Sequence, residues 1–352
     1  MEVFKAMGKY GHEQVLFTRE PAADYFGIIA IHNTTLGPAL GGCRYWSYES
    51  EEEALIDVLR LAMGMTYKAA VAGLNLGGGK SVIIGDPDTL RREMVFRAHG
   101  RAVESLQGRY ITAEDVGTSV EDMDYVHMET EFVVGIAGRS GDPSPVTAYG
   151  TYRGMKACAN AIWKEDSLEG KVVAVQGVGH VGYYLCENLA AEGAQLIVTD
   201  INNDRIERCV EDFGAEAVKA DEIYSVKADI FAPCALGAII NSRTIPKLKA
   251  KIIAGAANNQ LETEDDARAV QDREILYAPD YVINAGGLIN VYSELADWTT
   301  DRSKRKAGEI YQTLLEVFQL AREDKMTTAE AADRIAERRI DTVGKLHRSR
   351  LG

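Results

Sequence analysis

One short segment constrains the fold of this chain more than any other. Gly177-Val-Gly-His-Val-Gly182 follows the β-branched run Val172 to Val175 and opens a helical pattern that Gly193 ends. A second strand-like run ends at Asp200, about 20 residues on, where a dinucleotide-binding βαβ unit carries an acidic residue. The three glycines alone are a weak signal, but this strand, helix and acid together predict a doubly wound α/β domain that binds a dinucleotide.

Each glycine of the motif has a physical task. Gly177 permits a tight turn, Gly179 lets the backbone approach a pyrophosphate, and Gly182 lets helix and strand pack closely. The amides at the helix N-terminus would then face the phosphates. The predicted cofactor-binding segment is completed by Val178, His180 and Val181, of which His180 stands at a variable position and receives no task of its own.

Asp200 indicates which dinucleotide is bound. Its carboxylate would accept a hydrogen bond from a ribose 2′-hydroxyl and repel a 2′-phosphate, which favours NAD over NADP. Arg205 and Arg208 weaken this preference slightly. The alternative is a glycine turn that binds nothing, and the strand, the helix and the acid all argue against it.

The chain is expected to form two domains. Its 352 residues, 46% of them apolar, suffice for two cores at about 150 residues per domain. Gly138-Arg-Ser-Gly-Asp-Pro-Ser-Pro145 is typical of a loop or hinge. We therefore expect a first domain over residues 1–138, a Rossmann domain over 139–324, and a C-terminal helix over 325–352 that packs back on the first domain.

Local patterns place several elements. Strand-like runs precede the boundary at Tyr25–Ile31 and Ser81–Ile84, and the rhythm of a parallel sheet follows it, with runs at Val172–Val175, Leu196–Thr199, Asp229–Ala232, Ile252–Ala254, Ile275–Ala278 and Tyr281–Ile283. Capping-box spacing predicts helices that begin after Ser50 and Thr327. Another helix is predicted to bury one face, which carries Ile310, Leu314, Val317, Phe318 and Ala321.

Composition excludes several classes of function. The chain has 39 Lys and Arg against 53 Asp and Glu, a net charge of −14, whereas nucleic-acid binding needs a basic face. The basic cluster Arg302-Ser-Lys-Arg-Lys306 is interpreted as the solvated start of a helix. No charge-free stretch approaches the roughly 18 apolar residues of a membrane span, and the N-terminus lacks the pattern of a signal peptide. We expect a cytoplasmic protein that contacts neither nucleic acid nor membrane.

Cysteine and histidine spacing gives no metal site. The five cysteines form no C-x-x-C pair, and the six histidines form no H-E-x-x-H motif. We expect no structural metal and no disulfide framework.

Two lysines stand out in an otherwise uncharged segment. Lys68 and Lys80 lie within Tyr67-Lys-Ala-Ala-Val-Ala-Gly-Leu-Asn-Leu-Gly-Gly-Gly-Lys-Ser81, and lysines are rarely buried without a partner. A phosphate-binding P-loop is excluded by spacing, because Leu74 stands where that motif needs glycine. The three glycines are expected to let the backbone approach a ligand or to let another domain close over the site.

Two ammonium groups close together in an apolar cleft disfavour each other's charge. One lysine could then be neutral and basic while the other binds a substrate carboxylate. Glu114 and Asp115 follow a strand-like run from Tyr110 and could supply a proton carrier. From the residues alone, this set and a network of surface ion pairs both remain open.

The chain resembles the glutamate, leucine, phenylalanine and valine dehydrogenase family over nearly its whole length. The stretches that carry the resemblance are Thr34–Gly42, Gly73–Lys80, Gly108–Gly117, Pro143–Gly150, Ala254–Gln260 and Asn284–Gly287. The resemblance implies an N-terminal mixed-sheet α/β domain for substrate binding and oligomerisation, a cleft, and a Rossmann NAD-binding domain. It also implies NAD-dependent oxidative deamination of an amino acid to a 2-oxo acid and ammonium.

The resemblance assigns roles by motif. It implies that Lys80 is the catalytic base, Lys68 the ligand of the substrate carboxylate, Asp115 the proton-transfer partner, and that the backbone at Gly41 and Gly42 approaches the substrate. Further positions are implied around the nicotinamide and substrate, namely Thr147, Ala235, Asn258, Asn259 and Asn284, with the tasks of Asn258 and Asn259 unassigned. A homo-oligomer is implied, an octamer if the chain follows the leucine enzymes of the family.

The side-chain pocket is expected to be apolar. Its predicted residues are Leu40, Met65, Ala113, Leu288 and Val291, with no counter-charge for a glutamate side chain. Branched aliphatic amino acids therefore fit best. Leucine enzymes of the family usually carry Val where Leu288 stands, and one methylene changes discrimination by about 1 to 3 kcal/mol. Phenylalanine or valine as the substrate, and a catalytically silent NAD-binding protein, remain the alternatives.

Overall fold

The computed structural model describes residues 2–138 and 141–348, and it divides the chain into two compact units. The first unit comprises the residues up to Gly141, Glu294–Asp297 and the helix from Ala336 on; the second comprises Asp142–Ser293 and Trp298–Ile335. Two sequence predictions extend beyond the described residues. The loop predicted at 138–145 includes Arg139 and Ser140, and the C-terminal helix predicted at 325–352 includes residues 349–352.

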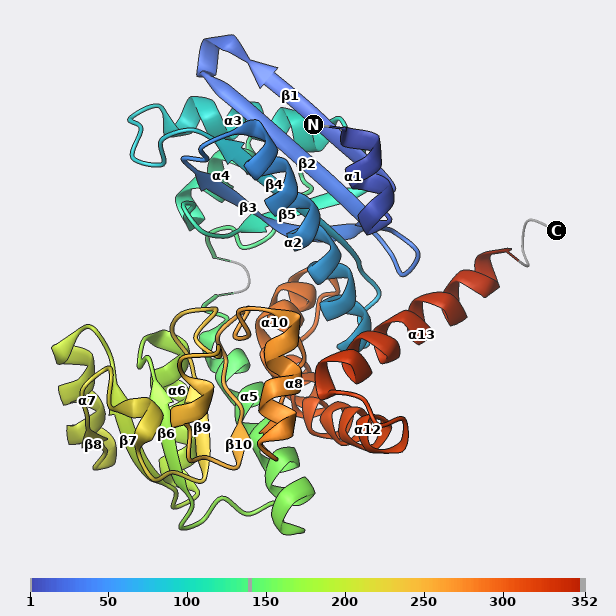
Figure 1. Cartoon of the computed structure of the whole chain (residues 1–352). Helices are drawn as coiled ribbons and strands as arrows, with labels where there is room; N and C mark the ends of the chain where they lie inside the picture. Colours follow the sequence, from blue (N-terminus) through green and yellow to red (C-terminus); the bar gives the residue numbers. More distant parts are fainter. Residues whose placement is uncertain (1, 139–140, 349–352) are drawn as a thin grey trace. The chain divides into compact units, whose positions relative to one another are not determined.

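The first unit is built on a five-stranded mixed sheet (Figure 1). Its strands are β1 (Gln14–Glu20), β2 (Tyr25–Asn33), β3 (Ala39–Trp46), β4 (Gly77–Ile84) and β5 (Tyr110–Glu114), in the order β1-β2-β4-β3-β5. β1, β2 and β4 pair antiparallel, whereas β3 pairs parallel with both β4 and β5. The helices are α1 (Val3–Tyr10), α2 (Glu51–Val71), α3 (Arg92–Glu104) and α4 (Val120–His127), with a 3-10 turn, η1 (Pro21–Ala23).

Helices cover both faces of this sheet, because its strands alternate between two apolar clusters. Ile28 and Ala30 of β2 pack with α2 on one face, whereas Ile29 and Ile31 pack on the other face with Val103 of α3. Successive side chains of a strand point to opposite faces, so a central strand buried on both sides is apolar at every position. Such a strand can therefore carry a functional side chain on one face and a supporting one on the other.

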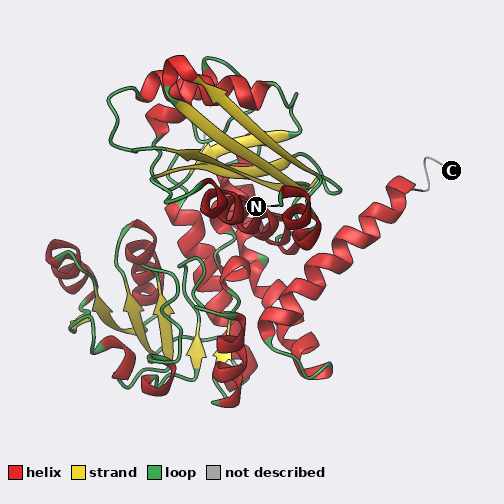
Figure 2. Ribbon diagram, turned by 45° about the horizontal axis from the view of Figure 1, so that its top comes forward, coloured by secondary structure: helices red, strands yellow, loops and turns green. Residues whose placement is uncertain are grey.

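The second unit is a doubly wound domain with a six-stranded parallel sheet (Figure 2). The strands are β6 (Val172–Gln176), β7 (Gln195–Thr199), β8 (Glu216–Ala217), β9 (Ile230–Pro233), β10 (Ile252–Ile253) and β11 (Leu276–Tyr277), in the order β11-β10-β9-β6-β7-β8. The helices are α5 (Ser144–Trp163), α6 (His180–Ala191), α7 (Asn203–Phe213), α8 (Glu264–Asp272), α9 (Asp280–Ile283), α10 (Gly286–Leu295), α11 (Thr300–Gly308), α12 (Ile310–Glu323) and α13 (Thr328–Arg348), with 3-10 turns η2 (Ile223–Ser225) and η3 (Ile245–Lys247). The last two residues of α10 and the part of α13 from Ala336 on belong to the first unit. The predicted two-domain α/β fold is confirmed.

Helix signals in the sequence were mostly accurate. The predicted apolar face of α12 is buried at all five positions, Ile310, Leu314, Val317, Phe318 and Ala321. At the start of α13, Thr327 and Glu330 exchange both hydrogen bonds of a capping box, at 2.6 Å and 3.2 Å. At the start of α2 only half of the predicted box forms: Ser50 accepts from the amide of Glu53, whose carboxylate accepts from Glu49 instead. The basic cluster at 302–306 lies in α11, as expected.

One local prediction was wrong, and a short edge strand was not predicted. The run Tyr281–Ile283, expected as a strand, lies in α9. Three β-branched or aromatic residues cannot distinguish a strand from one helical turn, and Val282 and Ile283 are buried as helix residues next to α5 and α12. The edge strand β8 was not predicted, because its two residues, Glu216 and Ala217, are exposed and carry no apolar pattern.

Among the described residues, no helix is long and apolar enough to cross a membrane.

Candidate active site and nucleotide-binding loop

Three neighbouring strands of the first unit place several predicted site residues on one face of its sheet. The register pairs Leu40 of β3 with Gly78 of β4, and Gly42 of β3 with Ala113 of β5. Lys80 lies two residues after Gly78, so its side chain leaves the same face of β4. This face is the one on which α2 packs, because Val82, two residues further on, belongs to the cluster of α2.

Lys80 and Asp115 form the closest ion pair of this face. The Nζ of Lys80 donates to Oδ2 of Asp115 at 2.6 Å, and the lysine side chain is only 7% exposed. Asp115 begins the turn after β5, where its amide donates to Oγ1 of Thr118 and Thr118 donates to the carbonyl of Cys43. The carboxylate is therefore held from its backbone as well as by the lysine.

A second cation reaches the same carboxylate oxygen. Nε of Arg44, on β3, donates to Oδ2 of Asp115 at 3.3 Å, and Nη1 donates to Oδ2 of Asp57 on α2 at 2.8 Å. Burial acts to raise the pKa of Asp115, but the Lys80 ammonium, its hydrogen bond and the Arg44 guanidinium overcome this effect and hold the pKa below its ordinary value. Asp115 is therefore a carboxylate flanked by two cations.

The glycines of this face are required by close contact. A Cβ on Gly41 would overlap the carbonyl oxygen of Gly79, and one on Gly78 would overlap the amide nitrogen of Thr66 in α2. A Cβ on Gly42 would lie 2.7 Å from Cβ of Asp115. Within this unit the glycines of 77–79 are required by the contacts of β4 with α2, β2 and β5. That they also serve a ligand or a moving domain stays a prediction.

The remaining predicted residues of the first unit lie around this contact. Met65 and Lys68 flank Thr66 on α2, and both side chains are half-buried. Leu40 and Ala113 are buried, at 2% and 8% exposure. Leu40 and Ala113 therefore place apolar surface on the face that also carries Lys80.

A buried network of uncharged groups supports the opposite face. His99 of α3 shares hydrogen bonds with the hydroxyls of Tyr25 at 3.1 Å and of Ser81 at 3.2 Å. Tyr110 donates from its hydroxyl to the carbonyl of Gly41 at 2.6 Å. Burial lowers the pKa of His99 to about 3, so the imidazole is neutral. The network joins the strand of Lys80 to the backbone of Gly41 without adding charge.

In the second unit, the glycine motif forms the turn between β6 and α6. Gly177 has a φ of +93°, and a Cβ on Gly182 would overlap the carbonyl oxygen of Gly177. Ala235, after β9, packs on the other side, where a Cβ on Gly177 would lie 2.5 Å from the methyl of Ala235. The motif therefore needs glycine for backbone conformation at its first position and for close packing at its last.

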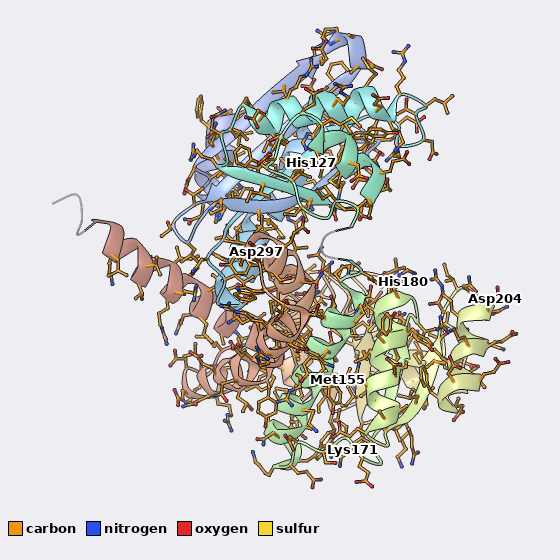
Figure 3. The ribbon with its side chains drawn as sticks, turned by 180° about the vertical axis from the view of Figure 1, so that it is seen from behind. His127, Met155, Lys171, His180, Asp204 and Asp297 are labelled. Carbon is orange, nitrogen blue, oxygen red and sulfur yellow. The ribbon has the colours of Figure 1, made fainter. Side chains whose placement is uncertain are left out.

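Asp200 lies at the end of β7 and its side chain is 6% exposed. It accepts from the amide of Val178 at 2.8 Å and from the amide of Asn202 at 2.9 Å, while Nη1 of Arg205 lies 3.9 Å from Oδ1. The carboxylate thus fixes the first turn of the glycine loop. His180 and Asp204 mark the starts of α6 and α7 at this edge of the sheet (Figure 3).

A cavity of about 310 Å³ lies at this edge. It is lined by two arginines, one carboxylate, aromatic residues and the start of α6, namely Arg205, Arg208, Asp142, Tyr183, Tyr184, Val178, Gly179 and His180. No side chain closes the space above Gly179: a Cβ there would meet only Nη1 of Arg205, at 3.6 Å. Backbone amides at a helix N-terminus and two cations suit the phosphates of a dinucleotide, so the residues fit NAD.

Other predicted residues of the second unit lie on α5, on α10 and in the loops before α8 and α10, and two contacts among these segments are described, which define a second cluster of Asn258, Asn284 and Thr147. Asn284 donates from Nδ2 to Oδ1 of Asn258 at 2.7 Å. A Cβ on Gly286, which begins α10, would lie 2.7 Å from Cα of Thr147 on α5. Asn259 is exposed, with a φ of +50°. On α10, Leu288 is 6% exposed and Val291 is half-buried.

Three residues of these networks, Arg44, Asp57 and His99, were not predicted from the sequence. Arg44 was detectable, because it is a lone charge two residues after Gly42 in an otherwise uncharged strand. Asp57 has the pattern of any polar residue on an amphipathic helix. His99 is a single histidine whose hydrogen-bond partners lie on other elements, so no local pattern identifies them. Their contacts bring together residues 13 and 74 positions apart, which local patterns do not reveal.

Comparison with known proteins covers both units. A family model described as Glu/Leu/Phe/Val dehydrogenase, dimerisation domain, matches residues 12–132. A second, described as Glutamate/Leucine/Phenylalanine/Valine dehydrogenase, matches residues 195–347. Together they include the strands that carry Lys80 and Asp115, and Asp200 at the end of β7.

Individual proteins match over nearly their full length. Leucine dehydrogenase of Geobacillus stearothermophilus is 59% identical over 98% of this chain and 95% of its own. L-tryptophan dehydrogenase of Nostoc punctiforme is 48% identical over 97% of each chain. A crystal structure of L-tryptophan dehydrogenase from Nostoc punctiforme has a TM-score of 0.88 at 47% identity, covering 97% of this chain and 99% of that one. Glutamate dehydrogenase from Peptoniphilus asaccharolyticus, at 21% identity and a TM-score of 0.78 over 98% and 96%, shares the fold.

Proposed function

This chain belongs to the glutamate, leucine, phenylalanine and valine dehydrogenase family, and we propose from that premise that its substrate is L-leucine. It is an amino acid dehydrogenase that catalyses the reversible, NAD-dependent oxidative deamination of L-leucine and other branched-chain L-amino acids to 2-oxo acids and ammonium. The support is the similarity to leucine dehydrogenases at 58–59% identity, against 47–48% for the tryptophan and phenylalanine enzymes.

The observation that carries the proposal is the ion pair of Lys80 and Asp115. A lysine that is 7% exposed, 2.6 Å from a carboxylate and on the same face as Leu40 and Ala113, can exchange a proton with a bound molecule beside an apolar surface.

The residues divide the reaction between them. Lys68 binds the substrate carboxylate and so orients Cα, which makes the transfer step effectively intramolecular. The glycine loop and Asp200 would hold NAD, which would supply a hydride acceptor for Cα. Loss of the hydride from the substrate with its amino group neutral would leave the protonated imine. Lys80 in its neutral form takes a proton from the water that attacks this imine, and Asp115 passes protons so that the carbinolamine releases ammonia.

The apolar residues set the choice of substrate. Leu40 and Ala113 in the first unit and Leu288 and Val291 in the second carry no charge that could pair with a glutamate side chain. One residue favours phenylalanine as a second candidate substrate. Leu288 stands where leucine enzymes of the family usually carry valine. Its extra methylene corresponds to about 1 to 3 kcal/mol of discrimination and leaves the reaction unchanged.

The cofactor assignment rests on the glycine loop and Asp200. The loop offers amides and Asp200 offers a carboxylate for ribose hydroxyls, which favours NAD. Within the second cluster, Asn258, Asn284 and Thr147 are proposed to line the nicotinamide side, and Asn259 the substrate side. A cytoplasmic location and a homo-octamer complete the proposal.

Initial rates of NADH formation near pH 10 test the activity. The substrates are L-Leu, L-Val, L-Ile, L-Phe and L-Glu, each with NAD and with NADP. We expect fast reduction of NAD with the aliphatic substrates and none with L-Glu. Absence of any rate in a preparation that binds NAD would instead establish a silent NAD-binding protein.

Lys80→Ala tests the role of the base. Loss of a positioned proton acceptor lowers turnover about 10²- to 10⁴-fold, while NAD affinity measured by calorimetry stays unchanged. Lys251→Ala, which removes an exposed lysine of the second unit, is the matched control. Near-normal turnover of Lys80→Ala would contradict the mechanism.

A further inference from the structure

Arg44 lies on the face of the sheet that carries Lys80, and it takes no part in the proposed reaction. Its guanidinium bridges two carboxylates, with Nε on Asp115 and Nη1 on Asp57. Tyr48 donates to the same oxygen of Asp57 at 2.7 Å, which fixes the far end of the bridge. The arginine is therefore anchored to α2 on one side and to the partner of Lys80 on the other.

The two cations compete for one oxygen. Lys80 and Arg44 both donate to Oδ2 of Asp115, at 2.6 Å and 3.3 Å. An arginine keeps its proton in a protein, so the one proton that can leave this triad of charges belongs to Lys80. The Arg44 guanidinium donates to the same carboxylate and so weakens the stabilisation that Asp115 gives to the protonated form of Lys80. Its positive charge also repels the Lys80 ammonium.

We propose that Arg44, anchored by Asp57 and Tyr48, is a positioning residue that shares the carboxylate of Asp115 with Lys80 and thereby keeps Lys80 able to release its proton during turnover. This inference rests on the proposed function, in which Lys80 acts in its neutral form. Asp57 then opposes Arg44: by pairing with the guanidinium it reduces the charge that Arg44 presents to Asp115.

Few charged groups near Asp115 can influence how readily Lys80 releases its proton. The titratable groups that act on or beside Asp115 come from β4, β3, β5 and α4 and are Lys80, Arg44, Cys43, Tyr110, Glu114 and Asp122. The helix α2, which packs against β4, adds Asp57, bonded to Arg44, and Lys68, the proposed ligand of the substrate carboxylate. Burial raises the pKa of Cys43 to about 12 and raises that of Tyr110, so both are neutral. Of the charged groups, Lys80 and Arg44 are the ones bonded to the carboxylate.

The outer side of the bridge is open to water. Arg44 and Asp57 line a cavity of about 420 Å³ together with Trp46 and Arg60, and the side chains of Arg44 and Asp57 are 23% and 28% exposed. Solvent therefore screens the effect of Arg44, and the expected change is moderate, roughly half to one pH unit. Arg60 presents the same charge to this cavity, which makes it a matched control.

The test measures the pH at which activity rises. In the proposed mechanism, kcat/KM for L-Leu rises as Lys80 loses its proton. Arg44→Gln removes the competing cation, so the rise should move to higher pH by roughly half to one unit. Asp57→Asn frees Arg44 from its counter-charge, so the rise should move to lower pH. Arg44→Lys keeps the charge and should restore the wild-type midpoint, and Arg60→Gln should leave it in place.

A second measurement separates this inference from the proposed function. Competitive acetylation of the full chain with acetic anhydride over a pH series, followed by mass spectrometry, reports the protonation of Lys80 without any turnover. Opposite displacements of its labelling midpoint in Arg44→Gln and Asp57→Asn support the inference even if no amino acid is oxidised. Unchanged midpoints in both variants overturn it, as does a loss of kcat in both without displacement, which a merely structural bridge would give.

Discussion

Two glycine-rich segments of this chain look alike in sequence and differ in what they require of glycine. Gly77–Gly79 lies inside the extended strand β4, and each position is pressed against neighbouring backbone or an aromatic ring. The turn Gly177–Gly182 joins β6 to α6, and its first glycine has a left-handed φ of +93° while its last contacts the carbonyl of the first.

Glycine is needed for close packing in the first segment, and for backbone conformation as well in the second. In β4 the backbone is ordinary and glycine is needed because α2, β2 and β5 approach too closely for a side chain. In the turn, glycine is needed both for φ and to leave the helix N-terminus open. The first segment therefore supports the packing of its unit, whereas the second leaves backbone uncovered at the N-terminus of α6.

The largest effect of a substitution in either segment is expected from Gly78→Ala. Its methyl would overlap the backbone amide of Thr66 in α2, and a buried helix and sheet cannot separate without loss of their shared core. We expect destabilisation of about 3 kcal/mol, the upper end for overpacking. Hydrogen exchange of the β4 amides measures it unit by unit, and normal protection of β4 in this variant would contradict the packing argument.

An effect of at least similar size is expected when acid challenges the unit of β4. His99 has a pKa of about 3 in the fold and His12 of about 4, both lowered by burial, against about 6.5 in an unfolded chain. The unfolded state therefore takes up protons first, and stability that is complete above about pH 6.5 falls as the pH drops toward 3, by up to about 1.4 kcal/mol per pH unit for each group.

Exchange of β4 and β6 amides between pH 7 and 4.5 checks this expectation. His99→Gln removes one of the titrating groups while it keeps a side chain able to bond Tyr25 and Ser81. Its β4 protection should fall less steeply with acid than that of the wild type. Equal slopes for the two proteins would show that His99 is not the group responsible.

Gly177→Ala tests the other segment. The left-handed φ costs a non-glycine residue about 1 to 2 kcal/mol, and the methyl would also press on Ala235. We expect NAD affinity to fall about tenfold, since 1.4 kcal/mol corresponds to that factor, while protection of β4 is unchanged. Adding Ala235→Gly should recover the steric part alone, and complete recovery would mean that conformation contributes nothing.

The smallest effect has the opposite sign. Gly8 lies on an exposed side of α1 with open space where its Cβ would be. Gly8→Ala should therefore stabilise the first unit by about 0.5 to 1 kcal/mol, seen as slower exchange in α1. A loss of stability would mean that this glycine also has a contact to protect.

Features that depend on residues close together in the sequence could be predicted, whereas those that depend on contacts between distant residues could not. The βαβ unit around Gly177–Gly182, the buried face of α12 and the capping box at Thr327 were predicted, because periodicity and capping residues lie within one element. The strand assigned to Tyr281–Ile283 was wrong and β8 was missed, since neither run is long enough to show a period.

The candidate site shows the same limit. Lys80 and Asp115 were singled out from composition and resemblance, and the structure places them 2.6 Å apart. The bridge of Arg44, Asp57 and Tyr48 and the network around His99 were not foreseen, because each joins separate elements through side chains whose meeting depends on the sheet order. The roles of these residues in turnover remain predictions that the variants above test.

Because the side chains of β4 alternate between two buried faces, this strand should tolerate insertions and deletions poorly. Lys80 and Ser81 are consecutive, so the first leaves the α2 face and the second leaves the face of His99. A single inserted or deleted residue in this strand would exchange the two faces and send the ammonium into the uncharged network. A scan of one-residue insertions and deletions should therefore be far less forgiving across β4 than across the exposed strand β8, which gives protein engineers a boundary for library design.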